Sequence, residues 1–176
     1  MLGAADVTGD EERVPTQIAR IVAGHVEAVV ALDEPGTLDA TRCLSYWTQA
    51  PSEVPVEYRA AIGASLYGCD ICQDVCPWNR GVEKRRAGQP LPSGSQSTVS
   101  LLEWLEDDGP ELVERYDRLF VPRNDPRYLR RNALLVAGNV GGTEHRPVLE
   151  RFAGDDDDLL SEQAEWSLAR LTDRGV

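Results

Sequence analysis

The sequence predicts a mainly α-helical protein in two parts, a short cysteine-bearing segment followed by a domain of paired helices. Three observations support this prediction. Apolar residues recur every three or four positions through most of the chain, the period of an amphipathic helix. All four cysteines fall between Cys43 and Cys76, and the last fifty residues repeat one apolar pattern. The first observation gives the fold class, and the other two divide the chain.

The composition narrows the function. The chain has 176 residues, 41% of them hydrophobic, and a formal net charge of −12. Binding to nucleic acid depends on Lys and Arg at phosphates, so an acidic chain must use a local basic patch for it. No apolar run approaches the roughly 20 residues of a membrane span, and no signal peptide is recognisable. We therefore expect a cytoplasmic protein.

The first elements in order are short. Residues 1–30 are predicted to form a tail and an amphipathic helix, and DEPG at residues 33–36 a turn. A short helix or turn at residues 38–47 presents Cys43. The next helix covers residues 56–62, because proline precedes it and glycine follows it.

A loop and two helices follow the cysteine motif. Residues 83–98 (EKRRAGQPLPSGSQST) have the Pro, Gly, Ser and charge content of a linker. Ser100 is a suitable cap for a helix through Leu105. Pro110 is expected to begin another helix that runs as far as Phe120.

The C-terminal residues contain an internal repeat. Helices are predicted after Asp125 and, 31 residues later, after Asp156, with a third helix between them that begins at Pro147. The two outer helices share apolar steps of four, four and three, at Leu129, Ala133, Ala137 and Val140 and at Leu160, Ala164, Leu168 and Leu171. Helix pairs repeated at this interval are typical of a short HEAT-like solenoid.

The cysteines carry the clearest chemical signal. Cys69-x2-Cys72-x3-Cys76-Pro77 has the spacing of iron–sulfur ligands, and Cys43 supplies a remote thiolate. In two-cluster ferredoxins the cysteine before proline binds the other cluster. Zinc and inert thiols are the alternatives, but zinc sites favour paired Cys or Cys/His knuckles. The fold class is thus mainly α, a partial ferredoxin-like 4Fe-4S module (31–82) followed by a HEAT-like α-helical repeat domain (99–176).

Several segments resemble one enzyme family. They are CLSYWTQ (43–49), PVEYR (55–59), YGCDICQDVCPWN (67–79) and the Arg131-Asn132-Ala133 run with Gly138-Asn139 after it. Together they are similar to epoxyqueuosine reductase, which reduces epoxyqueuosine at the tRNA wobble position to queuosine. The resemblance covers about residues 31–176 and implies a cobalamin domain, two [4Fe–4S] clusters and a helical domain that engages tRNA.

The resemblance also implies roles for single residues. Cys43, Cys69 and Cys72 match ligands of the second cluster, and Cys76 matches the ligand that crosses to the first. Ser45 and Asp70 match positions near the cobalamin, although both residue types also form turns and helix caps. A flavodoxin or ferredoxin is the implied electron donor.

One part of the family pattern is missing from this sequence. The earlier Cys-x2-Cys-x2-Cys-x3-Cys-Pro motif and the cobalamin domain with its catalytic acid have no counterpart here. The chain is therefore expected to be a fragment of the reductase that is inactive alone and contains no catalytic residue. The other hypotheses are a stand-alone 4Fe-4S electron-transfer protein and a zinc-binding helical-repeat interaction protein.

A cluster of arginines gives a candidate RNA contact. Arg123, Arg127, Arg130 and Arg131 lie within nine residues at the start of a predicted helix. Such a group is suited to phosphate contacts. The alternative is a solvated helix face whose arginines pair with nearby Asp and Glu.

Overall fold

The computed structural model describes residues 40–86 and 98–176, and this part of the chain contains helices and no strand. The predictions for residues 1–39 and most of the linker lie outside the described residues. The elements in chain order are η1 (Ala40–Arg42), α2 (Leu44–Gln49), α3 (Val56–Ile62), α4 (Ile71–Asp74), α5 (Arg80–Arg86), α6 (Leu101–Glu106), α7 (Gly109–Arg115), η2 (Pro122–Asn124), α8 (Arg127–Val140), η3 (Thr143–His145), α9 (Arg146–Ala153) and α10 (Asp158–Asp173).

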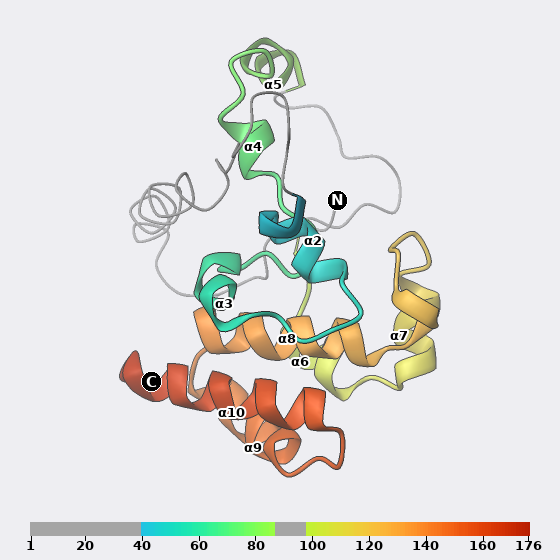
Figure 1. Ribbon diagram of the computed structural model, residues 1–176, viewed down its shortest axis with the longest axis vertical. Coiled ribbons are helices and arrows are strands. Elements are labelled where there is room, and N and C mark those ends of the chain that lie inside the picture. The colour runs from blue at the N-terminus through green and yellow to red at the C-terminus, as the bar shows by residue number, and fades with distance from the viewer. Residues whose placement is uncertain (1–39, 87–97) are drawn as a thin grey trace.

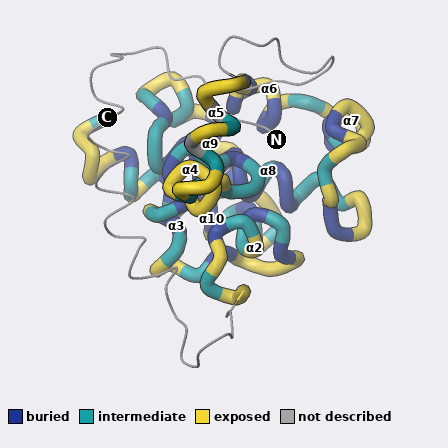
Figure 2. The backbone as a smooth tube through the Cα atoms, turned by 90° about the horizontal axis from the view of Figure 1, so that it is seen from above, coloured by how far each residue is buried: buried dark blue, intermediate teal, exposed yellow. Residues whose placement is uncertain are grey.

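Helix α8 lies at the centre of the molecule. It contacts α10 and α6 and also the early helices α2 and α3, while α9 packs on α10 (Figure 1). Every residue from 131 to 138 is buried, so α8 has no solvent-facing side over that stretch (Figure 2). In contrast, α4 and α5 project from this core. No helix in the described part is long and apolar enough to cross a membrane.

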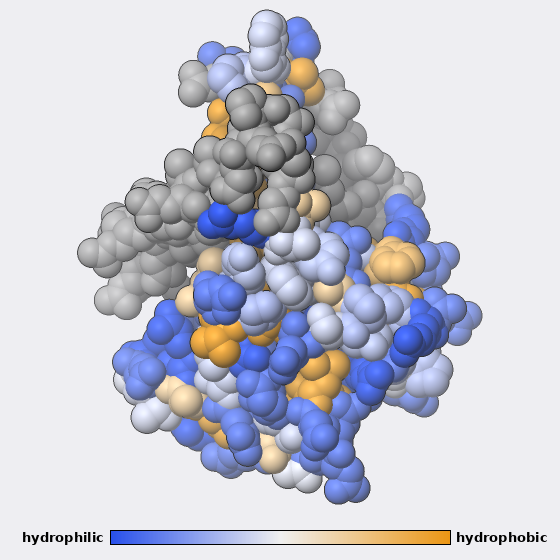
Figure 3. Space-filling model, viewed as in Figure 1, coloured by the Kyte–Doolittle hydropathy of each residue, from blue (hydrophilic) through white to orange (hydrophobic). Residues whose placement is uncertain are grey.

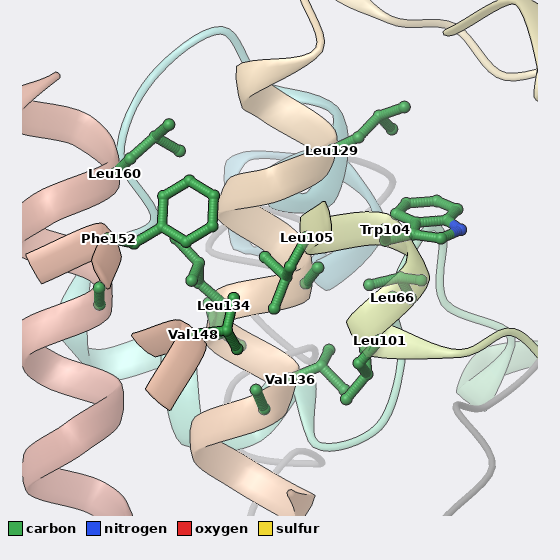
Figure 4. Close-up of a cluster of buried hydrophobic side chains, with 14 of the residues drawn as sticks. Leu66, Leu101, Trp104, Leu105, Leu129, Leu134, Val136, Val148, Phe152 and Leu160 are labelled. Carbon is green, nitrogen blue, oxygen red and sulfur yellow. The ribbon is translucent and has the colours of Figure 1, made fainter. Parts of the chain in front are cut away.

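One hydrophobic core joins the cysteine-bearing segment to the C-terminal helices. Leu66, which precedes the cysteine motif, packs beside Leu101 and Trp104 (Figure 4). Leu134 of α8 and Phe152 of α9 belong to the same cluster, together with Leu44, Val54 and Ile62. The two parts distinguished in the sequence are therefore packed around a common interior.

Local chemistry sets several helix ends as predicted. The hydroxyl of Ser100 accepts a hydrogen bond from the Glu103 amide, which caps α6. Helix α3 spans Val56–Ile62, and Gly63 ends it with a φ of 58°, a conformation that glycine adopts at little cost. The bounds of α3 match the sequence prediction because both end signals are local.

Two predictions about helix ends were wrong. Residues 83–86, assigned to a linker, form the end of α5. Helix α7 stops at Arg115 rather than at Phe120, because the chain leaves the helical conformation at Tyr116 (φ −111°, ψ 40°). At the start of α10, the Asp157 carboxylate caps the helix by accepting hydrogen bonds from the amides of Leu159 and Leu160.

The internal repeat is visible as two corresponding helices. Helix α8 begins at Arg127 and α10 at Asp158, a shift of 31 residues, with α9 between them. Both helices turn the predicted apolar row toward the core, although Val140 of α8 and Leu168 of α10 are only half-buried. Whether these helices form a HEAT-like repeat stays a prediction.

The closest approach of α8 to α10 gives a stability prediction. A Cβ on Gly138 would lie 2.7 Å from Cα of Ser167, so Gly138→Ala must push the helices apart. We expect a loss of about 1–3 kcal/mol in the free energy of unfolding, measured by urea denaturation. Gly81→Ala is the control, because nothing lies within 4 Å of its added Cβ. An unchanged midpoint for Gly138→Ala would contradict the close packing of α8 on α10.

Candidate iron–sulfur site

The four cysteines lie on short elements above α8, and all four are free thiols. Cys43 is the residue before α2 and is exposed. Cys69 is half-buried in the loop that leads to α4, Cys72 is exposed on α4, and Cys76 follows that helix. The sequence motif thus occupies a loop, one short helix and the residues after it.

The loop of Cys69 is linked to the helix that follows Cys43. The Gly68 amide, directly before Cys69, donates to the Thr48 hydroxyl of α2 at 2.9 Å. Burial raises the pKa of the Cys69 thiol, and a hydrogen bond from the Ile71 amide partly opposes this. The charges of Cys43, Cys72 and Asp70 raise the pKa further. The remote cysteine therefore precedes a helix that contacts the motif.

The donor set is of the type that iron–sulfur chemistry uses. Four thiols without disulfides are the ligands that [4Fe–4S] clusters take. Within residues 40–86 and 98–176, no three Cys, His, Asp or Glu side chains lie close enough together to hold a metal ion. The choice of iron–sulfur ligands therefore rests on the residue type and spacing of the cysteines.

The loop that carries Cys69 is held by its neighbours. Gly68 has a φ of 77°, a left-handed conformation that favours glycine, and its amide donates to the Thr48 hydroxyl at 2.9 Å. After α4, the Asn79 side-chain amide donates to the Gln73 carbonyl at 3.1 Å. These contacts fix the path of the motif on both sides of its helix.

The tip of the molecule beyond this loop is partly apolar. Figure 3 shows apolar side chains exposed among hydrophilic ones where α4 and α5 project. Val75 and Trp78 are 52% and 89% exposed. The thiols thus lie between the buried core and a projecting, partly apolar surface.

The structure places the two residues matched to the cobalamin site near the cysteines. Ser45 lies on α2, and its hydroxyl accepts a hydrogen bond from the side-chain amide of Gln49 at 3.0 Å. Asp70 occupies the capping position of α4, but its exposed side chain makes no capping hydrogen bond. Helix capping therefore does not account for the Asp70 carboxylate.

Arg131 is not part of an RNA-facing surface, contrary to the prediction. Its side chain is 0% exposed. The guanidinium donates to the main-chain carbonyls of Trp47 (3.0 Å), Ala50 (2.8 Å) and Ser52, and to the side-chain oxygen of Asn132. Burial lowers the pKa of Arg131 to about 10, so it remains charged at neutral pH with its donors already used.

The other three predicted arginines differ in their surroundings. Arg127 forms ion pairs with Asp125 at 2.8 Å and with Asp157 at 3.4 Å. Arg130 donates to the Asp107 carbonyl at 2.6 Å. Arg123 is exposed, in a left-handed conformation with a φ of 58°. The structure therefore divides the arginine cluster, and of the four only Arg123 is both exposed and without a described partner.

Sequence reasoning missed two buried polar anchors. Asn132 donates to the Thr48 carbonyl at 2.8 Å. Arg59, 2% exposed, donates to the Val54 carbonyl and pairs with Glu162 of α10 at 2.9 Å. One signal was available for Asn132: a helix that is apolar on all sides is buried, so polar residues within it must find internal partners.

Comparison with known proteins agrees with this geometry. A family model described as a 4Fe-4S double cluster binding domain matches residues 28–79, which include all four cysteines. This segment is therefore similar to the domains of proteins that bind two 4Fe-4S clusters.

Most of the chain is similar to the epoxyqueuosine reductases. It is 32% identical to the epoxyqueuosine reductase of Lactococcus garvieae over 79% of this chain and 40% of that protein. The Streptococcus thermophilus enzyme structure matches with a TM-score of 0.69 and 26% identity, over 85% of this chain and 40% of the other. A structure of epoxyqueuosine reductase with an epoxyqueuosine-modified tRNA-Tyr stem loop matches with a TM-score of 0.67 and 27% identity, over 84% and 40%. The chain thus spans about 40% of the length of these relatives.

Proposed function

We propose that this chain supplies iron–sulfur ligands and a tRNA-side helical domain to the reduction of epoxyqueuosine to queuosine in tRNA. One observation carries the proposal: all four cysteines lie, as free thiols, within the segment that matches the double cluster domain. A relative solved with a modified tRNA stem loop supports the substrate class.

The cysteines divide between two clusters in this proposal. Cys43, Cys69 and Cys72 hold one [4Fe–4S] cluster, which accepts and passes on single electrons when bound. Cys76 turns toward the other cluster, following the crossover rule of two-cluster ferredoxins. The partial burial of Cys69 keeps one side of the first site away from water.

Ser45 and Asp70 are the residues proposed to face the cobalamin. Both lie next to cluster ligands, Ser45 two residues after Cys43 and Asp70 between Cys69 and Cys72. A hydroxyl and an unpaired carboxylate can orient a polar group by hydrogen bonding. Bound cobalamin would supply the reduced cobalt that acts on the epoxide.

Iron and acid-labile sulfide measured on anaerobically reconstituted protein test the proposal. We expect about four irons per chain with matching sulfide and broad visible absorption, because Cys43, Cys69 and Cys72 with one external thiol from the reconstitution mixture complete the four thiolates of a cuboidal cluster. Stoichiometric zinc in colourless protein, or no bound metal, would overturn the proposal. A filled cluster with no affinity for tRNA would instead favour a stand-alone electron carrier.

A role for Arg123 at tRNA gives a second measurement. We expect Arg123→Ala to weaken binding of an epoxyqueuosine-modified stem loop and to reduce the slope of log K against log salt by about one. Arg115→Ala is a matched control, because Arg115 is also exposed but pairs with Asp107 at 2.8 Å. Equal slopes for the two variants would remove Arg123 from the proposed interface.

A further inference from the structure

We infer that Thr48 is a positioning residue for the iron–sulfur site, holding the Cys69 loop at a fixed place beside the helix that begins after Cys43. The inference rests on the proposed cluster site and adds a residue that is not a ligand. It also gives a structural role to the central helix α8, which holds the main chain at Thr48 by hydrogen bonds.

The Thr48 side chain connects the two cysteine-bearing segments. Its hydroxyl oxygen accepts from the Gly68 amide at 2.9 Å, and Gly68 directly precedes Cys69. The same hydroxyl donates to the Ser45 carbonyl at 2.9 Å, within the helix that follows Cys43. Thr48 is 2% exposed, so water cannot easily replace either bond.

Helix α8 fixes the segment that carries Thr48. Asn132 donates to the carbonyl of Thr48 itself at 2.8 Å. Arg131 donates to the carbonyls of Trp47 and Ala50, on either side of it in sequence. These carbonyls belong to the last turn of α2 and would otherwise lack partners. The connection therefore runs from α8 to α2, and from the Thr48 hydroxyl to the loop of Cys69.

The connection matters because the elements around the cysteines are too short to hold themselves. Helix α2 has six residues and α4 has four, and isolated helices of that length are not stable in water. Cys43 and Cys69 are separated by 26 positions, so their distance depends on tertiary contacts. Residues behind a metal's ligands commonly set the ligand geometry and affect metal affinity about 10- to 100-fold.

The unloaded protein gives the first test. Dibromobimane links two thiolates by forming two C–S bonds and releasing two bromide ions. In the full chain we expect a Cys43–Cys69 link and a Cys69–Cys72 link, identified by mass spectrometry of tryptic peptides. Thr48→Val removes the hydroxyl but keeps the shape of the side chain. It should lower the yield of the Cys43–Cys69 link about tenfold relative to that of the Cys69–Cys72 link. Thr48→Ser should restore it. An unchanged ratio in Thr48→Val would overturn the inference.

The loaded protein gives the second test. We expect Thr48→Val to lose iron to a chelator about tenfold faster than the wild type. Ser167→Ala is the control, because it also removes a fully buried hydroxyl, one that donates to the Leu134 carbonyl away from the cysteines. It should lose iron at the wild-type rate. If both variants lost iron equally faster than the wild type, Thr48 would have no specific role in positioning the site.

The two tests separate the inference from the function on which it rests. A wild type without iron, whose Cys43–Cys69 link still depends on Thr48, would refute the cluster and keep the positioning. A wild type that binds iron, but whose Cys43–Cys69 link does not depend on Thr48, would support the cluster and refute the positioning role. If Thr48→Val loses its helical circular dichroism, Thr48→Ala replaces it, since alanine adds no group that could clash.

Discussion

Cys69→Ala should reduce bound iron from about four per chain to background after anaerobic reconstitution. Cys69 is half-buried, whereas Cys43 and Cys72 are exposed. Its removal leaves the proposed cluster with only two protein thiolates, Cys43 and Cys72. The measurement is iron and sulfide per chain, with far-UV circular dichroism to confirm that the helices remain.

Cys76→Ala is the matched comparison for this result. Cys76 belongs to the same motif but directly precedes Pro77, the position whose cysteine binds the other cluster in two-cluster ferredoxins. We therefore expect Cys76→Ala to keep the cluster of the other three cysteines. Equal loss of iron in the two variants would show that all four thiols surround one cluster, which would contradict the crossover assignment.

Arg131→Met should have the largest effect on stability among the variants considered. It leaves the carbonyls of Trp47, Ala50 and Ser52 without their donor inside the protein. Each buried polar group left unsatisfied costs about 1–3 kcal/mol, so we expect a loss of roughly 3 kcal/mol or more in the free energy of unfolding. Urea denaturation at pH 7 measures this loss, and Arg131→Lys should recover only part of it because lysine lacks the planar fork.

Arg130→Met serves as the control on the same helix. Arg130 is half-buried and donates to one carbonyl, that of Asp107. Its replacement should cost about 0.5–1.5 kcal/mol, the range for a single hydrogen bond. If the two variants unfold at the same urea concentration, Arg131 is not the anchor that its contacts indicate.

The sequence predicted those parts of the fold that depend on local signals. Gly63 and Ser100 end and begin helices through contacts with residues three positions away, so their neighbours in sequence sufficed. Helix α7 was predicted too long because the apolar residues after Arg115 continue a helical spacing. Phe120 nevertheless lies exposed in a loop. Its main-chain carbonyl accepts a hydrogen bond from the Tyr67 hydroxyl, a partner 53 residues away.

The candidate site was predictable only in part for the same reason. Ligand type followed from the spacing of Cys69, Cys72 and Cys76, which is local. Cys43 could be named as a remote thiolate from the sequence, but its position relative to the motif is not a local property. The link between the two segments is the contact of Thr48 with Gly68 across 20 residues. Arg131 was misplaced because a charged residue normally indicates a surface, whereas here three carbonyls from distant residues compensate its burial.

The acceptors of Arg131 have a consequence for how homologous sequences can diverge. They are main-chain carbonyls at positions 47, 50 and 52, and every amino acid supplies a carbonyl there. Substitutions at those three positions can therefore accumulate without breaking the contact, provided that the backbone keeps its path. An insertion or deletion between them would move the carbonyls out of reach. In this segment evolution is freer to change residue identity than chain length.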